Sequence, residues 1–259
     1  MLFAQISDSH VLTGGRLLAG RFDTGAAFDR LVDSLARQPV RPDLILFSGD
    51  LGEDATAEEY AHVGARLRDL GIPVRAVPGN HDARAPMRAE LPDMLGQTAA
   101  GHLCVYDDSF PLAIIGLDTL VEGAPHGMLC SDRLGWLEDR LQACADRPAL
   151  IFMHHPPITT GLRDMDSMGL LSGREDLARL IGAHGQVQAI LCGHMHRAIQ
   201  GDCGGAPVRV SPSASHQIAF DLRPDQPYRF TGEPAQYMMH LWQPGDGLVS
   251  HTVPVAAAA

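Results

Sequence analysis

The chain has 259 residues, of which 45% are hydrophobic, so it can bury a large core and has a usual length for one catalytic α/β domain. Its formal net charge is −11, and because the sequence contains no lysine, every basic residue is an arginine. This charge argues against long nucleic acid as a partner, since binding to a phosphate backbone is driven by basic side chains. We therefore expect a single domain, residues 1–259, with a small-molecule partner.

The cysteines and the apolar runs point to a cytoplasmic protein. The five cysteines are an odd number with no C-x-x-C pair, which argues against a disulfide framework and a structural zinc site. No apolar run reaches the roughly 18 residues of a transmembrane helix, and the first residues lack the positive charge of a signal peptide. We expect no membrane partner.

Short apolar runs alternate with helical patterns along most of the chain. The runs have the length and flanking polar residues of buried strands. They lie at Leu2–Ile6, Leu44–Phe47, Val74–Val77, Leu112–Leu117, Ala149–Met153 and Ala189–Cys192. After about residue 201 proline and glycine become frequent, and strands are expected at 236–242 and 248–253. This β-rich closing segment, about 201–255, is assigned to the same domain.

Four helices are expected between these strands. The spacing of apolar residues from Phe28 to Leu35 predicts the first, and Thr56 with Glu59 predicts a capping box at the start of the second. Ser131 is expected to cap a third helix, and Leu177–Ile181 lies in a fourth. The order β-α-β-α-β up to residue 80 indicates an α/β fold.

Metal-binding types of side chain follow five of the predicted strands. In open α/β sheets, binding sites lie at the carboxyl ends of the strands, so these five loops are expected to meet at one edge. They are Ser7-Asp8-Ser9-His10, Gly49-Asp50, Gly79-Asn80-His81-Asp82, His154-His155-Pro156-Pro157 and Gly193-His194-Met195-His196.

These residues predict a centre for two metal ions. In Asp8-x-His10 and His194-x-His196, strand alternation is expected to turn both side chains of each pair to one face. Two metal ions about 3.5–4 Å apart repel each other and need a shared anionic ligand. Asp50, which follows a glycine, is the expected bridge. The prediction gives one ion Asp8, His10, Asp50 and His196, and the other Asp50, Asn80, His154 and His194.

The predicted centre favours phosphodiester hydrolysis. Two divalent ions, two carboxylates and one bridging hydroxide sum to +1, which matches a diester monoanion, and the ions would make hydroxide available as the nucleophile. His81 is not needed as a ligand, so we expect it to protonate the leaving alkoxide or to stabilise the transition state. Asp82 is the expected partner that orients His81, with capping of local backbone amides as the alternative.

The motifs D-x-H, G-D, G-N-H-D, H-H-P-P and G-H-x-H, in this order, resemble the calcineurin-like metallophosphoesterase superfamily. Segments such as Phe152–Pro157 and Pro212–Gln217 are similar to one branch, the class III cyclic nucleotide phosphodiesterases and bacterial glycerophosphodiesterases. The resemblance implies a four-layer αββα sandwich, in which helices flank two mixed β-sheets. It also implies metals drawn from Fe, Mn, Zn or Co, frequent homo-oligomers, and a position for His216 near the substrate phosphate.

Several readings stay open at this stage. Asn80, His81, His155 and His216 are the candidate substrate-binding residues, although His155 could instead pack behind the site. Asp118 is interpreted as structural, and the loops 12–22 and 158–171 are expected to decide specificity.

The main hypothesis is a phosphodiesterase for 3′,5′-cyclic nucleotides such as cAMP or for glycerophosphodiesters. One alternative is a phosphomonoesterase or a nucleotide or lipid pyrophosphohydrolase of the same superfamily. The alternative from another class is a non-catalytic metal-binding scaffold, which would be expected to have lost some of these ligands.

Overall fold

The strands of the chain form two large mixed sheets in the computed structural model, which describes residues 1–256. The first sheet has the order β15-β14-β1-β2-β3, with β1, β2 and β3 parallel and β14 antiparallel to β1. Its strands are β1 (Leu2–Ile6), β2 (Leu44–Phe47), β3 (Val74–Ala76), β14 (Gln236–Gln243) and β15 (Gly247–Pro254).

The second sheet has the order β10-β11-β9-β7-β5-β4, with four parallel central strands and an antiparallel strand at each edge. Its strands are β4 (Val105–Asp107), β5 (Ala113–Leu117), β7 (Ala149–Met153), β9 (Val187–Cys192), β10 (Ile199–Cys203) and β11 (Ala206–Val210).

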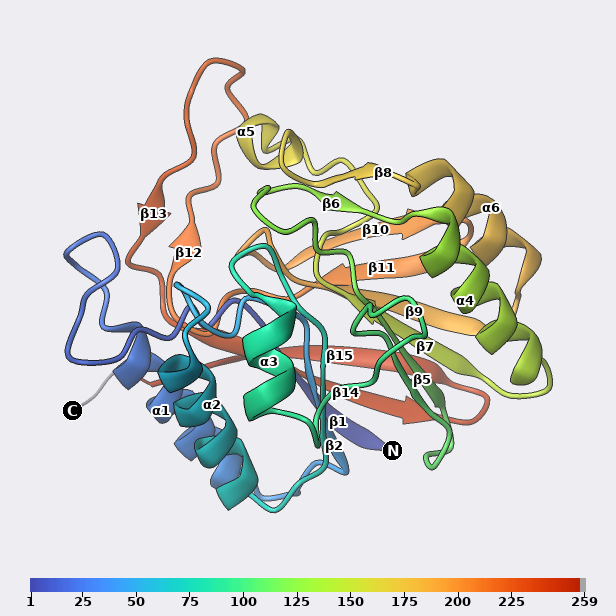
Figure 1. The fold of residues 1–259 in the computed structure, drawn as a ribbon, viewed down its shortest axis with the longest axis horizontal. Coiled ribbons are helices and arrows are strands. Elements are labelled where there is room, and N and C mark those ends of the chain that lie inside the picture. Colours follow the sequence, from blue (N-terminus) through green and yellow to red (C-terminus); the bar gives the residue numbers. More distant parts are fainter. Residues whose placement is uncertain (257–259) are drawn as a thin grey trace.

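Helices cover the outer faces of both sheets (Figure 1). The first sheet packs against α1 (Thr24–Ala36), α2 (Ala57–Asp69) and α3 (Arg84–Glu90), and the second against α4 (Ser131–Ala143) and α6 (Arg174–Ala183). The inner faces of the two sheets bury a separate apolar core. The predicted αββα sandwich is therefore confirmed.

Alternation along the strands divides the side chains between these cores. In β2, Leu44 and Leu46 lie in the core between the sheets, whereas Ile45 and Phe47 pack toward the helices. This is the period of two that an extended strand imposes. Because β2 is buried on both faces, it appears in the sequence as an unbroken apolar run.

Three small features lie at one end of the sandwich (Figure 1). A hairpin joins β12 (Gln217–Ile218) to β13 (Phe230–Thr231), and β6 (Gly127–Met128) pairs with β8 (Leu170–Ser172). The short helix α5 (Arg163–Asp166) stands beside the hairpin, where the backbone N–H of Tyr228 donates to Asp164 Oδ2 at 3.0 Å. The predicted loop 158–171 is thus partly ordered as a helix.

The structure tests several local predictions from the sequence. Helix α4 begins at Ser131 itself, and the residue before it, Cys130, makes no side-chain capping bond, so the predicted Ser131 cap is wrong. The capping box of Thr56 and Glu59 is confirmed. The closing strands β14 and β15 join the first sheet beside β1. None of the helices in residues 1–256 has the length and apolar character to cross a membrane.

Candidate active site

The residues of the five motifs meet where β1, β2, β3, β7 and β9 end. Five of them have a left-handed backbone: Asp8 (φ 55°), His10 (φ 46°), Asp50 (φ 54°), His194 (φ 70°) and His196 (φ 48°). The interpretation of D-x-H and H-x-H as alternating strand residues is therefore wrong, because both pairs lie beyond their strands in tight turns. Non-glycine residues in this conformation cost about 1–3 kcal/mol each and cluster at functional sites.

The donor atoms of these residues converge around Asp50. Asp50 Oδ2 lies 3.5 Å from His10 Nε2 and 3.3 Å from His154 Nε2. On one side, His196 Nε2 lies 3.1 Å from His10 Nε2 and 3.4 Å from Asp8 Oδ1. On the other side, His154 Nε2 lies 3.1 Å from the amide oxygen of Asn80.

The geometry has the form of two ligand sets that share one carboxylate. His194 belongs to the second set, next to His154, with 5.1 Å between the ring centroids. Its Nε2 atom is buried and has no hydrogen-bond partner among the described residues. A buried polar atom without a partner is costly, and a metal ion would satisfy it. All seven predicted ligands are thus brought together.

Local charges keep the two carboxylates ionised. Burial raises the pKa of Asp50, but the imidazoles of His154 and His81 hold it well below its usual range. Burial also raises the pKa of Asp8, but His196 and His154 together lower it below its ordinary value. Burial alone would lower the pKa of His154, but Asp50 raises it to about 9. Divalent cations fit this donor set, since they replace protons on such imidazoles and neutralise the carboxylates.

Each of three histidines is fixed by its second ring nitrogen. His154 Nδ1 donates to Ser48 O at 2.8 Å, and His196 Nδ1 donates to His216 O at 2.9 Å. His10 Nδ1 lies 2.7 Å from Glu53 Oε2. These bonds turn the Nε2 atoms toward the centre, which is the usual arrangement around metal-binding histidines.

Glycines allow the close approach of these groups. A Cβ atom on Gly49, where φ is 95°, would lie 2.4 Å from His154 Nδ1, and one on Gly79 would lie 2.2 Å from Asp50 Oδ1. The glycine before Asp50 thus leaves the space that the His154 ring occupies.

His81 points into the site, but its predicted partner does not contact it. The Asp82 carboxylate instead accepts hydrogen bonds from the backbone N–H groups of Leu51 and Gly79 and from the Tyr60 hydroxyl. The carboxylate near His81 is that of Glu53, with Oε2 3.3 Å from His81 Nδ1. Asp82 therefore holds the loops together, and the assignment of Asp82 as the orienting partner of His81 is corrected.

The sequence motifs do not identify Glu53 as a residue of the site. It follows Gly49-Asp50 by three residues but belongs to no motif, and its two histidine partners come from other loops. The available signal was a carboxylate within the metal-binding loop itself.

His155 and His216 are both almost fully buried, but of the two His216 lines the cavity and His155 does not. His155 is fully buried, with Nδ1 2.8 Å from Thr119 Oγ1 and Nε2 donating to Pro125 O at 3.3 Å. Both of its ring nitrogens are used, so the prediction of His155 as a substrate contact is corrected in favour of packing. His216 Nδ1 lies 2.8 Å from Ser215 Oγ, and the ring borders the cavity above the metal-binding cluster.

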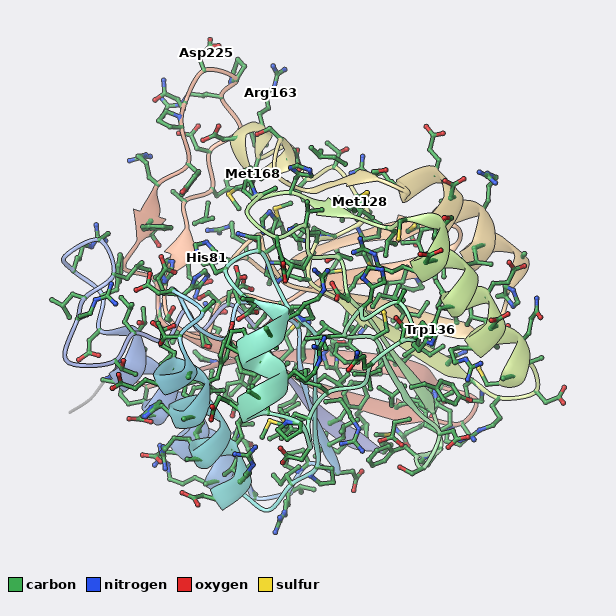
Figure 2. The ribbon with its side chains drawn as sticks, viewed as in Figure 1. His81, Met128, Trp136, Arg163, Met168 and Asp225 are labelled. Carbon is green, nitrogen blue, oxygen red and sulfur yellow. The ribbon has the colours of Figure 1, made fainter. Side chains whose placement is uncertain are left out.

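A cavity of about 320 Å³ opens over this cluster. His81 lies at its edge with 37% of its side chain exposed. Figure 2 shows His81 and Met168 at the end of the molecule where α5 and the β12–β13 hairpin project, and both residues line the cavity. A volume of this size suits a small molecule rather than a polymer.

Asp118 lies outside this cavity and has a structural role. It accepts two hydrogen bonds from the Arg84 guanidinium, at 2.7 and 2.9 Å, and one from the backbone N–H of Leu103. This agrees with its interpretation from the sequence.

Residues 1–198 match the family model described as calcineurin-like phosphoesterase. The chain belongs to this family. As a calcineurin-like phosphoesterase it is a metal-dependent hydrolase of phosphate esters, and the matched residues include all seven predicted metal ligands, from Asp8 to His196.

Curated relatives of this calcineurin-like phosphoesterase carry two kinds of name. A probable glycerophosphodiester phosphodiesterase GpdQ of Arcobacter nitrofigilis is 36% identical, over 97% of this chain and 92% of the relative. A probable cyclic nucleotide phosphodiesterase of Rhodopseudomonas palustris is 32% identical, over 97% and 91%. Among solved structures, a dimetal phosphatase from Danio rerio has a TM-score of 0.65 at 15% identity, over 98% and 99%, which supports the fold.

Proposed function

We propose that this calcineurin-like phosphoesterase is a two-metal phosphodiesterase for small diesters, with 3′,5′-cyclic nucleotides and glycerophosphodiesters as the candidate substrates. The observation that carries the proposal is the convergence of seven ligand-type side chains on Asp50 beneath a small cavity bordered by His81 and His216. The names of the relatives at 36% and 32% identity support the same reaction class.

In this proposal, Asp8, His10, Asp50 and His196 hold one ion, and Asp50, Asn80, His154 and His194 hold the other. When bound, two ions supply a nucleophile from water at neutral pH and offset the charge on the phosphoryl oxygens. Fe, Mn, Zn and Co all suit this mixed set of nitrogen and oxygen donors, so availability decides which ion binds.

The charge around the cavity favours a diester. Glu53 adds one negative charge to the net charge of +1 that the motifs predict for the metal centre. His81 offsets that charge when protonated. Without metal, burial opposes the charged imidazole, but Asp50 and Glu53 raise the pKa of His81 from its ordinary value. With His81 protonated, two divalent ions, two carboxylates, hydroxide, Glu53 and His81 sum to about +1, which would match a diester monoanion.

His81 and His216 are the proposed groups that act on the substrate. Because His81 Nδ1 faces Glu53, its Nε2 atom is left to donate a proton to the leaving alkoxide. His216 offers Nε2 to the substrate phosphate, since its Nδ1 contacts Ser215. We also propose a cytoplasmic location, which the five free thiols support.

A side-by-side assay of metal-loaded protein tests the proposal. The substrates are cAMP, glycerophosphoethanolamine, a phosphomonoester and a nucleoside diphosphate derivative. We expect the highest kcat/KM on one of the two diesters. A strong preference for the monoester or for the diphosphate derivative would refute the assignment, and metal-loaded protein that turns over none of the four would support the non-catalytic scaffold instead.

A further inference from the structure

The cavity over the metal-binding cluster has two chemically different sides. Its floor consists of the polar residues described above. Apart from Pro125, its wall consists of apolar and aromatic side chains from three separate segments: Leu18, Met165, Met168, Ile218, Tyr228 and Phe230. The Tyr228 hydroxyl is the one oxygen or nitrogen among these six side chains.

Part of this wall is already packed in place. Met165 and Ile218 are 4% and 2% exposed, and both belong to the core of the second sheet. Phe230 lies edge-on to His216, with ring centroids 4.5 Å apart and an interplanar angle of 80°. Its other neighbours are Tyr228 at 5.6 Å and Phe22 at 6.1 Å. The aromatic ring next to the phosphate-facing histidine is therefore held in a fixed position.

Such a wall discriminates between the organic groups of a diester. The hydroxyl groups of a glycerol arm would lose their hydrogen bonds to water at this wall. Only the Tyr228 hydroxyl could replace them, which disfavours binding. The faces of a flat aromatic ring have no hydrogen bonds to lose, and they gain contacts with aromatic rings and with the polarisable sulfur atoms of methionine. Among residues 1–256, no arginine lines the cavity, so further phosphate groups on this arm would meet no guanidinium.

We propose that Met165, Met168 and Phe230 form a subsite for the organic arm of the substrate, and that this arm carries an aromatic ring such as a nucleobase. This inference rests on the proposed phosphodiesterase function and selects one substrate class within it. The subsite lies between α5 and the β12–β13 hairpin, next to His216.

The test compares cAMP with its analogue in which hydrogen replaces the base. The two molecules share the same cyclic phosphate and the same scissile bonds, so a difference in kcat/KM reports on the base alone. We expect the analogue to be at least about tenfold poorer, as is usual when an apolar pocket loses its ligand group. Glycerophosphoethanolamine should also be poorer than cAMP.

A matched pair of variants locates the effect. Met168→Gln keeps the length of the side chain but makes it polar, and it should lower the ratio of the two kcat/KM values severalfold. Met128→Gln, in β6 and outside the cavity lining, should leave the ratio unchanged; Figure 2 labels both methionines. Phe230→Leu keeps an apolar side chain without the ring, and it serves as a second variant if Met168→Gln fails to fold.

The outcomes separate the subsite from the reaction. Equal kcat/KM for cAMP and its analogue, faster hydrolysis of glycerophosphoethanolamine, or an unchanged ratio in the folded variants would each overturn the subsite and leave the phosphodiesterase proposal standing. No hydrolysis of any diester by metal-loaded protein would overturn both.

Discussion

Replacing Glu53 with glutamine tests the charge that supports the metal-binding cluster. Glu53 Oε2 lies 2.7 Å from His10 Nδ1, and the Glu53 side chain is 19% exposed, so solvent screens this contact only in part. A hydrogen bond to a charged group contributes about 1.5–3 kcal/mol, against about 0.5–1.5 kcal/mol for a neutral one. Because Glu53→Gln keeps an oxygen acceptor, it should lose the difference, about 1–1.5 kcal/mol.

This loss corresponds to about tenfold weaker metal binding, since 1.4 kcal/mol is a factor of ten in an equilibrium constant. The value lies at the lower end of the 10–100-fold effects of residues that orient metal ligands. The assay is competition of Mn²⁺ or Zn²⁺ between the protein and a chromophoric chelator. The control is Asp54→Asn, one residue further along, whose carboxylate pairs with Arg16 at the surface.

The reasoning fails if Glu53→Gln binds the metal as tightly as the unchanged protein. It also fails if Asp54→Asn weakens binding equally, because the effect would then come from general surface charge.

Three further substitutions test individual roles. Asp50→Ala should abolish both hydrolysis and paired metal binding, because it removes the shared carboxylate; metal analysis showing two bound ions would contradict this. His81→Ala should keep two metals and lose about 100-fold or more in kcat on esters with poor leaving groups; equal losses on activated esters, measured side by side, would argue against a proton donor. Gly49→Ala should lower the free energy of unfolding by about 1–3 kcal/mol, because alanine disfavours a positive φ. Its Cβ atom would also displace His154 and weaken metal binding. Thermal unfolding and metal titration measure these two effects, and an unchanged melting temperature would show that the alanine is accommodated without strain.

The parts of the site that depend on strand ends were predictable. Each central strand is buried on both faces and therefore appears as an apolar run, and the residue types after the run identify the ligands. This is why the sequence alone predicts that these seven side chains, from Asp8 to His196, come together; their role as metal ligands stays a prediction. Helix α3 was not predicted, because of its side chains only Met87 is buried and no apolar periodicity results.

The contacts between loops were not predictable from spacing. His10 and Glu53 are 43 residues apart, and only the left-handed turn at His10 aims its Nδ1 atom at that carboxylate. The same turn invalidated the alternation expected of Asp8-x-His10. The sequence predicts that Asp82 contacts its neighbour His81. Its carboxylate instead accepts hydrogen bonds from the Tyr60 hydroxyl and from backbone N–H groups of two loops.

The apolar wall of the cavity depends even more strongly on the fold. Leu18, Met165 and Phe230 are more than 60 residues apart from one another, and they come from segments without a shared pattern. The loops 12–22 and 158–171 were expected to decide specificity, but the contribution of the β12–β13 hairpin emerges only from the packing of that hairpin beside α5.

The central claim is that two metal ions held around Asp50 are needed to hydrolyse a phosphodiester. The most direct measurement is the rate of hydrolysis of bis(p-nitrophenyl) phosphate while metal-free protein is titrated with Mn²⁺ or Zn²⁺. The account predicts that activity rises until two ions are bound per chain and then stays constant. Full activity at one ion per chain, or no turnover with two ions bound, would contradict it.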